Sequence, residues 1–103
     1  MAEFTGKRYI TSGVENEIPV ELQFTMWDMI DVLRHSNQKL DYLQVFMLRP
    51  VYEKGTQVQE IVHKQEQPWR KKKITVESDA PVSAKIFVID DTTHITMLLN
   101  HEY

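Results

Sequence analysis

The most concentrated group of potential metal ligands in the sequence lies between residues 90 and 94. Asp90, Asp91 and His94 place two carboxylates and an imidazole within five residues, and a hairpin loop can bring such groups around a divalent cation. The same residues have an ordinary structural use, because Asp side chains in turns accept hydrogen bonds from nearby backbone N–H groups. The spacing matches no known metal motif. We therefore expect a hydrogen-bonded turn here, with a metal-binding or catalytic loop as the alternative.

A second group combines one aromatic side chain with four basic ones: Trp69, Arg70, Lys71, Lys72 and Lys73. Single-stranded nucleic-acid sites use aromatic rings to stack on bases and cations to neutralise phosphates. The competing interpretation is a solvated hairpin turn whose lysines keep a strand edge from pairing with another chain. We favour the turn, because the run is short and the chain has a net charge of −3. The nucleic-acid interpretation gains support if these residues share a face with Arg49 and Lys64.

The sequence contains none of the common catalytic motifs. It has no cysteine, which excludes disulfides, thiolate zinc sites and thiol nucleophiles. It also has no glycine-rich phosphate loop and no Gly-x-Ser-x-Gly nucleophile elbow. His101 and Glu102 have the residue types of an acid/base pair, but chain ends fray and hold such a pair poorly. We expect a protein that is not an enzyme and that uses no cofactor.

Hydrophobic periodicity predicts one helix and five or six strands. The helix begins at Pro19, which suits a first helical position, and ends near Ser36. The predicted strands are Arg8–Ser12, Tyr42–Leu48, Thr56–Gln65, Ile74–Glu77, Ala84–Ile89 and His94–Leu99. Short connections favour antiparallel pairing. The predicted fold class is α+β, with one long amphipathic helix packed on a curved, mainly antiparallel sheet in a single domain over residues 1–103.

The predicted helix is apolar on two sides, whereas a helix on a sheet normally has one apolar stripe. The expected core stripe consists of Leu22, Met26, Met29, Ile30 and Leu33. The opposite side carries Val20, Phe24, Trp27, Asp31 and Arg34. Three explanations remain open for what covers this second face: another part of the chain, a second copy in a homodimer, or a different partner. Our leading hypothesis is a protein-interaction or regulatory module that acts through it.

Composition sets the general class of the protein. A chain of 103 residues with 42% hydrophobic and 26% charged residues fits one folded domain. No apolar run reaches the roughly 18 residues that a membrane-spanning helix needs. The first eight residues have no apolar region of the kind found in secretory signals. We expect a cytoplasmic protein without membrane contact.

Several segments together resemble a family of small uncharacterised proteins from staphylococci, enterococci, lactobacilli and related Firmicutes, catalogued as a domain of unknown function. The segments are Arg8–Val14, Glu17–Gln23, Lys39–Phe46, Gln65–Pro68, Ala84–Asp91, Thr93–His94 and Thr96–Leu99. Thr92 departs from the family pattern, which has glycine in this loop, and we expect a wider or more strained loop. The resemblance implies a bacterial cytosolic protein and supplies no activity or catalytic residue.

Overall fold

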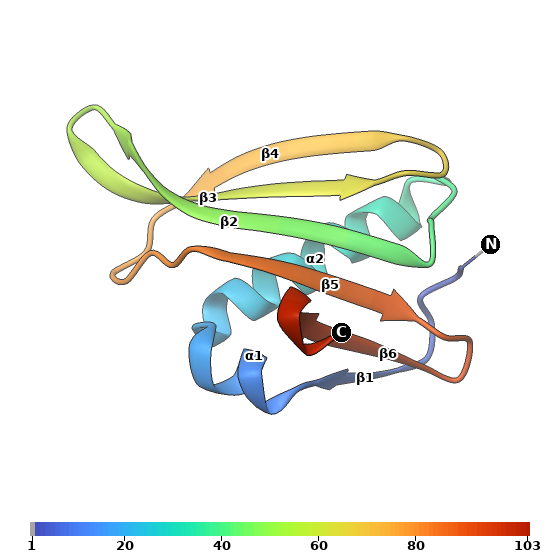
Figure 1. Cartoon of the computed structure of the whole chain (residues 1–103). Coiled ribbons are helices and arrows are strands. Elements are labelled where there is room, and N and C mark those ends of the chain that lie inside the picture. The colour runs from blue at the N-terminus through green and yellow to red at the C-terminus, as the bar shows by residue number, and fades with distance from the viewer. Residues whose placement is uncertain (1) are drawn as a thin grey trace.

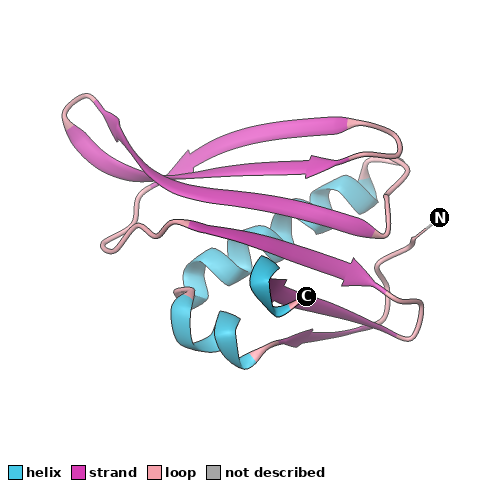
Figure 2. Cartoon of the chain, in the orientation of Figure 1, coloured by secondary structure: helices cyan, strands magenta, loops and turns pink. Residues whose placement is uncertain are grey.

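The computed structural model describes residues 2–103, which form one six-stranded sheet and two α-helices (Figures 1 and 2). Along the chain the elements are β1 (Lys7–Ile10), α1 (Ser12–Glu17), α2 (Val20–His35), β2 (Leu43–Glu53), β3 (Thr56–Gln65), β4 (Arg70–Val76), β5 (Ala84–Asp90), β6 (His94–Leu99) and the 3-10 turn η1 (Asn100–Glu102). The strand order is β1-β6-β5-β2-β3-β4. β1 runs parallel to β6, and all other neighbours are antiparallel.

The predicted fold class is wrong. The domain is mostly sheet, and the sheet is mixed because β1 runs parallel to β6. Within residues 2–103 only one helix is long: α2 has 16 residues, whereas α1 has six. Two strands are longer than their apolar patterns indicate, because β4 begins at Arg70 and β2 continues to Glu53. Backbone hydrogen bonds to a neighbouring strand can hold polar residues extended, and apolar periodicity does not detect them.

β2 continues through Pro50, where the sequence predicted its end. The ladder between β2 and β5 stops where Leu48 lies opposite Ala84. No β5 residue therefore lies opposite Pro50 to accept a hydrogen bond from a backbone N–H at this position. On its other side Pro50 lies opposite Gln59 of β3. A proline is tolerated in a strand where its missing N–H faces no partner, which explains the long β2–β3 hairpin. In Figure 1 this hairpin extends past the N-terminal end of α2.

One side of α2 and the sheet face toward it share a hydrophobic core. The predicted core stripe of the helix is confirmed, since Leu22, Met26, Met29, Ile30 and Leu33 are all buried. The fully buried strand residues of this core are Phe46, Ile61, Ile86, Val88, Ile95 and Met97. We call the sheet face toward α2 the inner face and the opposite one the outer face. In Figure 1 the outer face is turned to the viewer and α2 lies behind the sheet.

The carboxylate of Glu102 fastens η1 to α1, a helix that the sequence did not predict. It accepts hydrogen bonds from Thr11 Oγ1 at 2.6 Å, from the Leu99 N–H at 2.8 Å and from the Gly13 N–H at 3.2 Å. Thr11 also caps α1 by accepting from the Val14 N–H at 3.3 Å. A Cβ atom at position 13 would lie 2.6 Å from the Glu102 carboxylate, so the clamp needs glycine there.

Candidate functional site

β4 carries the basic segment as a strand, and its alternation divides the predicted nucleic-acid residues between the two faces of the sheet. Lys71 and Lys73 point to the outer face and are exposed. Arg70 and Lys72 lie opposite buried residues of β3, on the inner face. Trp69 precedes the strand and is 69% exposed. The structure therefore brings only part of the predicted set together.

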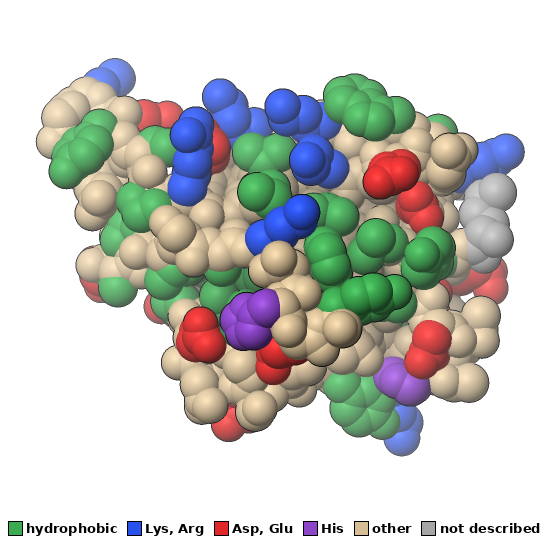
Figure 3. Space-filling model, in the orientation of Figure 1, with side chains coloured by type: hydrophobic (Ala, Val, Ile, Leu, Met, Phe, Trp, Pro, Cys, Tyr) green, Lys and Arg blue, Asp and Glu red, His purple; other side chains and the backbone are tan. Residues whose placement is uncertain are grey.

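Four lysines from three strands gather on the outer face: Lys64, Lys71, Lys73 and Lys85. Lys64 of β3 lies opposite Lys71 of β4, and Lys85 of β5 lies opposite Met47 of β2. Half-buried or exposed aliphatic side chains separate them, and these are Val45, Met47 and Val62. Figure 3 shows basic side chains bordering an apolar area on this face. The outer face therefore combines positive charge with accessible apolar surface.

Aromatic side chains surround a shallow depression of about 740 Å³ beside these lysines. Trp69, Tyr42 and Phe87 line it together with Lys64 and Lys85. The ammonium of Lys85 lies 5.7 Å from the centre of the Phe87 ring, which is within the range of a cation–π contact. Exposed aromatic rings and cations therefore meet in one place.

Arg49 also lies on the outer face, a placement that adds support to the nucleic-acid interpretation, but it is paired. Its Nε donates to Oε1 of Glu60 at 2.7 Å. This hydrogen bond lowers the pKa of Glu60 below its ordinary value, with smaller contributions from the charges of Arg49, Lys73 and Lys71. The charge of Glu60 is thus balanced by Arg49. Asp41 and Glu66 also line the depression, and the four lysines outnumber these two carboxylates.

The second face of α2 is partly covered by the chain itself. Trp27 is 9% exposed, and the Arg8 guanidinium of β1 lies 4.8 Å from its ring centre. Asp31 accepts hydrogen bonds from Arg8 and from Arg34. Burial raises the pKa of Asp31, but these two hydrogen bonds outweigh it, so the pKa lies below the ordinary value.

Two residues of that predicted interaction face remain open. Val20 is 55% exposed and Phe24 is 63% exposed. They occupy the first turns of α2, away from the Arg8 contact. The structure therefore divides the five predicted residues into an exposed apolar pair and three others. Of these, Trp27 and Asp31 contact Arg8 of β1, and Arg34 pairs with Asp31.

The β5–β6 loop has the hydrogen bonds of a structural turn. Asp90 accepts from the Phe4 N–H at 2.9 Å, which holds the N-terminal segment in place. Asp91 Oδ1 accepts from the His94 N–H at 2.9 Å, and this contact lowers the pKa of Asp91. Thr92 has φ of 79°, in the left-handed region that favours glycine, so the backbone is strained at this residue. Residues 2–103 contain no group of three or more His, Asp or Glu side chains placed to hold a metal.

Three buried polar residues of the inner face were missed by the sequence analysis. Gln44, His63 and Gln65 are at most 7% exposed and are joined by hydrogen bonds. The sequence does contain a signal, because Gln59, His63 and Gln65 fall on the same side of a strand with period two.

Residues 7–102 match the family model described as staphylococcal protein of unknown function, DUF960. The chain belongs to this family. The chain is also similar to a crystal structure of a protein of unknown function from Enterococcus faecalis, with 27% identity and a TM-score of 0.78, over 100% of this chain and 97% of the other. A search of curated proteins found no similar protein.

The family resemblance predicted from the sequence is therefore confirmed. The DUF960 description carries no activity, so function has to be argued from the geometry of this chain. Among the helices of residues 2–103, none has the length and apolarity to cross a membrane.

Proposed function

We propose that this protein binds single-stranded nucleic acid on the outer face of its sheet. The observation that carries the proposal is the gathering of four lysines and the exposed Trp69 on one side of the molecule. Bases of a single strand can stack on aromatic side chains, while lysines neutralise the phosphates between them. A sheet surface suits this mode because it presents such side chains in a fixed register.

The local charge supports the proposal more than the overall charge does. The net charge of −3 gives no general attraction to nucleic acid. On the outer face, however, the acidic Glu60 is paired with Arg49, and the four lysines outnumber the two carboxylates of the depression, Asp41 and Glu66. Screening limits this attraction to about 8 Å at physiological ionic strength, so a distant acidic surface does not cancel it.

The interaction hypothesis for α2 has less support. It requires Trp27 to be accessible, and this ring is buried beneath Arg8. Asp31 and Arg34 are engaged with each other. Only Val20 and Phe24 remain as exposed apolar residues of that face, and a pair of side chains is smaller than a stable interface needs.

The test is a fluorescence-anisotropy titration with labelled RNA and DNA of about 12 nucleotides, within the site sizes of single-strand binders. The wild type should bind in the micromolar range and more weakly at high salt. The double variant Lys71→Gln/Lys73→Gln should bind about tenfold more weakly, with a salt slope reduced by about 1.4, because about 0.7 counterions are released per phosphate contact. Trp69→Ala should cost about 1–3 kcal/mol of binding free energy.

The matched control is Arg70→Gln/Lys72→Gln, which removes the same charge from the other face of β4. It should bind the labelled strands within about twofold of the wild type if only the outer face contacts them. Absence of salt-dependent binding at micromolar protein would rule the proposal out. In that case, light scattering that gives twice the 12.2 kDa chain mass, and that returns to monomer in Met47→Lys, would assign the outer face to self-association.

A further inference from the structure

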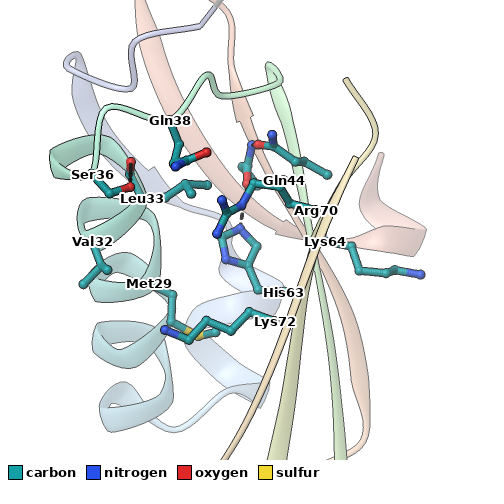
Figure 4. A pocket seen from close by; sticks show the side chains of 11 residues that line it. Met29, Val32, Leu33, Ser36, Gln38, Gln44, His63, Lys64, Arg70 and Lys72 are labelled. Atoms are coloured by element: carbon teal, nitrogen blue, oxygen red, sulfur yellow. Dashed lines mark hydrogen bonds between the residues drawn. The ribbon is translucent and has the colours of Figure 1, made fainter. Parts of the chain in front are cut away.

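A pocket lies on the inner face, between the C-terminal half of α2 and the strands β3 and β4 (Figure 4). Its volume is about 210 Å³. The wall from α2 is apolar and consists of Met29, Val32 and Leu33. The opposite wall is polar and includes His63, Arg70 and Lys72. The pocket therefore joins an apolar side to a cationic one.

Hydrogen bonds fix the orientation and the tautomer of His63. Its ring stacks on Phe46 at 4.3 Å, and its Nε2 lies 2.6 Å from Oε1 of Gln44. The amide nitrogen of Gln44 donates to the Asp41 carbonyl and to Gln65 Oε1, each at 2.8 Å, so Gln44 Oε1 must be an acceptor. Nε2 of His63 is therefore the protonated nitrogen, and Nδ1 carries a lone pair.

Nδ1 of His63 is free to accept a hydrogen bond from a ligand. No group among residues 2–103 donates a hydrogen bond to Nδ1. Every fully buried side-chain nitrogen or oxygen of these residues has a hydrogen-bond partner, so Nδ1, which has none, is not fully buried. Nδ1 is therefore open to the pocket, and Figure 4 shows this nitrogen turned toward α2. Burial lowers the pKa of His63 to about 4, and the charges of Arg70 and Lys72 contribute, so the ring stays neutral near pH 7.

The charge of the pocket selects for anions. No Asp or Glu lines it, whereas Arg70 and Lys72 each contribute a full positive charge. α2 ends at the pocket, and its macrodipole contributes only about half a negative charge there. Figure 4 shows the Lys72 side chain extending toward Met29, while Lys64 points away from the pocket. The two cations therefore dominate.

We propose that this pocket is a binding site for a small organic anion. A carboxylate or phosphate group would lie by Arg70 and Lys72, and an apolar body would pack against Met29 and Leu33. An N–H or O–H of the ligand would donate to Nδ1 of His63. The volume is below the 300–1,000 Å³ of typical drug-sized sites, so the ligand is a small metabolite. This site is independent of the nucleic-acid proposal because it lies on the other face of the sheet.

The experiment is an NMR titration of the labelled full chain with benzoate, 4-hydroxybenzoate, phenyl phosphate and, as a neutral control, benzyl alcohol. The three anions should cause saturable shifts of the pocket amides, with benzyl alcohol at least about tenfold weaker. Stronger binding of phenyl phosphate or of the carboxylates supports the site and identifies the anion class. The imidazole ¹⁵N spectrum should show Nδ1 of His63 moving with 4-hydroxybenzoate and not with benzoate.

Two double variants separate this site from general charge effects. Arg70→Gln/Lys72→Gln should weaken anion binding at least about tenfold, while Lys71→Gln/Lys73→Gln, with the same loss of charge on the outer face, should leave it unchanged. Thermal melting of both variants checks that they remain folded. Equal binding of benzyl alcohol, absence of saturable shifts, or an equal effect of the two variants would overturn the proposal. An Nδ1 resonance that never moves would overturn the role of His63.

Discussion

Phe46 and Phe87 lie on neighbouring strands, β2 and β5, but on opposite faces of the sheet. Phe46 is fully buried and stacks on His63. Phe87 is half-buried and meets Tyr103 edge-on, with ring centres 5.7 Å apart. The two residues have the same side chain in the same kind of strand, and they differ in what covers them. Coverage by α2, rather than residue type, decides which aromatic residues belong to the core.

The basic residues of β4 show the same division. Lys71 and Lys73 face the open outer surface, and Arg70 and Lys72 face the pocket beside α2. An extended surface favours a long polymer with repeated charges, whereas a pocket favours a small ligand with one charge. One basic segment therefore supplies two different chemical environments through the alternation of a strand.

The largest expected difference between the faces is in stability. Phe46→Ala should lower the free energy of unfolding by about 3–5 kcal/mol, because it removes a fully buried ring from the core. Phe87→Ala should lower it by about 1 kcal/mol or less, since that ring is already partly in water. Urea unfolding of both variants measures the difference. Similar losses in the two variants would contradict the division into a covered and an open face.

The same contrast is expected on α2. Trp27→Ala should lower the free energy of unfolding by about 3–4 kcal/mol, because the substitution removes a core side chain and its contact with Arg8. Phe24→Ala should change stability by less than about 0.5 kcal/mol, since Phe24 is 63% exposed. Thermal and urea unfolding test this pair. A stable Trp27→Ala variant with altered association would instead restore the interaction hypothesis for this helix face.

The inner face should also be sensitive to pH through His63. The pKa of His63 is about 4 in the folded protein and 6.5 when the side chain is exposed. Between pH 4 and pH 6.5 the unfolded chain therefore binds a proton at this residue that the folded chain does not bind. The stability from this residue is fully present above pH 6.5 and is lost as the pH falls toward 4. The loss should reach about 3 kcal/mol, at 1.36 kcal/mol per unit.

The control for this prediction is His63→Gln, which keeps a polar side chain without a group that titrates in this range. Urea unfolding of both proteins from pH 7.5 to pH 4 gives the difference between their free energies of unfolding at each pH. The contribution of the carboxylates to the pH dependence cancels in this difference, because both chains contain the same carboxylates. Parallel pH profiles would show that His63 is as solvated in the folded chain as in the unfolded one.

The smallest effect concerns two hairpin turns, one between β2 and β3 and one between β5 and β6. Thr92 and Gly55 have φ of 79° and 80°, so a β-branched residue and a glycine adopt nearly the same positive φ. Thr92→Gly should raise stability by about 0.5–1 kcal/mol, because relief of strain exceeds the added entropy of the unfolded chain. Gly55→Ala should lower it by about 1 kcal/mol, since a Cβ there meets no other atom and only strain remains. Calorimetric melting should give shifts of opposite sign.

The sequence predicted the elements that have strong apolar periodicity. α2, β5 and β6 lie within one or two residues of their predicted ranges, and the buried stripe of α2 is as expected. The short strand near Arg8 was also expected, but not its parallel pairing with β6. Strand partners that far apart leave no local pattern, because pairing depends on the whole fold.

The candidate sites were less predictable than the elements. The basic run was assigned to a turn, although Arg70–Lys73 form part of β4. Its extended conformation comes from pairing with β3, which no periodicity of charged residues reveals. The pocket depends on His63, whose polar side chain is buried only because α2 crosses above it. Residue types indicated chemistry here, but the covering element decided where that chemistry lies.

The pairing of β1 with β6 has a consequence for how the protein is made in the cell. Thr11 and its partner Glu102 are 91 residues apart, and ribosomes add about 5–20 residues per second. The first strand therefore emerges roughly 5 to 18 seconds before the groups that hold it exist. During that interval the nascent chain presents an unpaired strand and the apolar Phe4, which is later buried. A chaperone that binds short apolar segments would meet this segment before β6 has been synthesised.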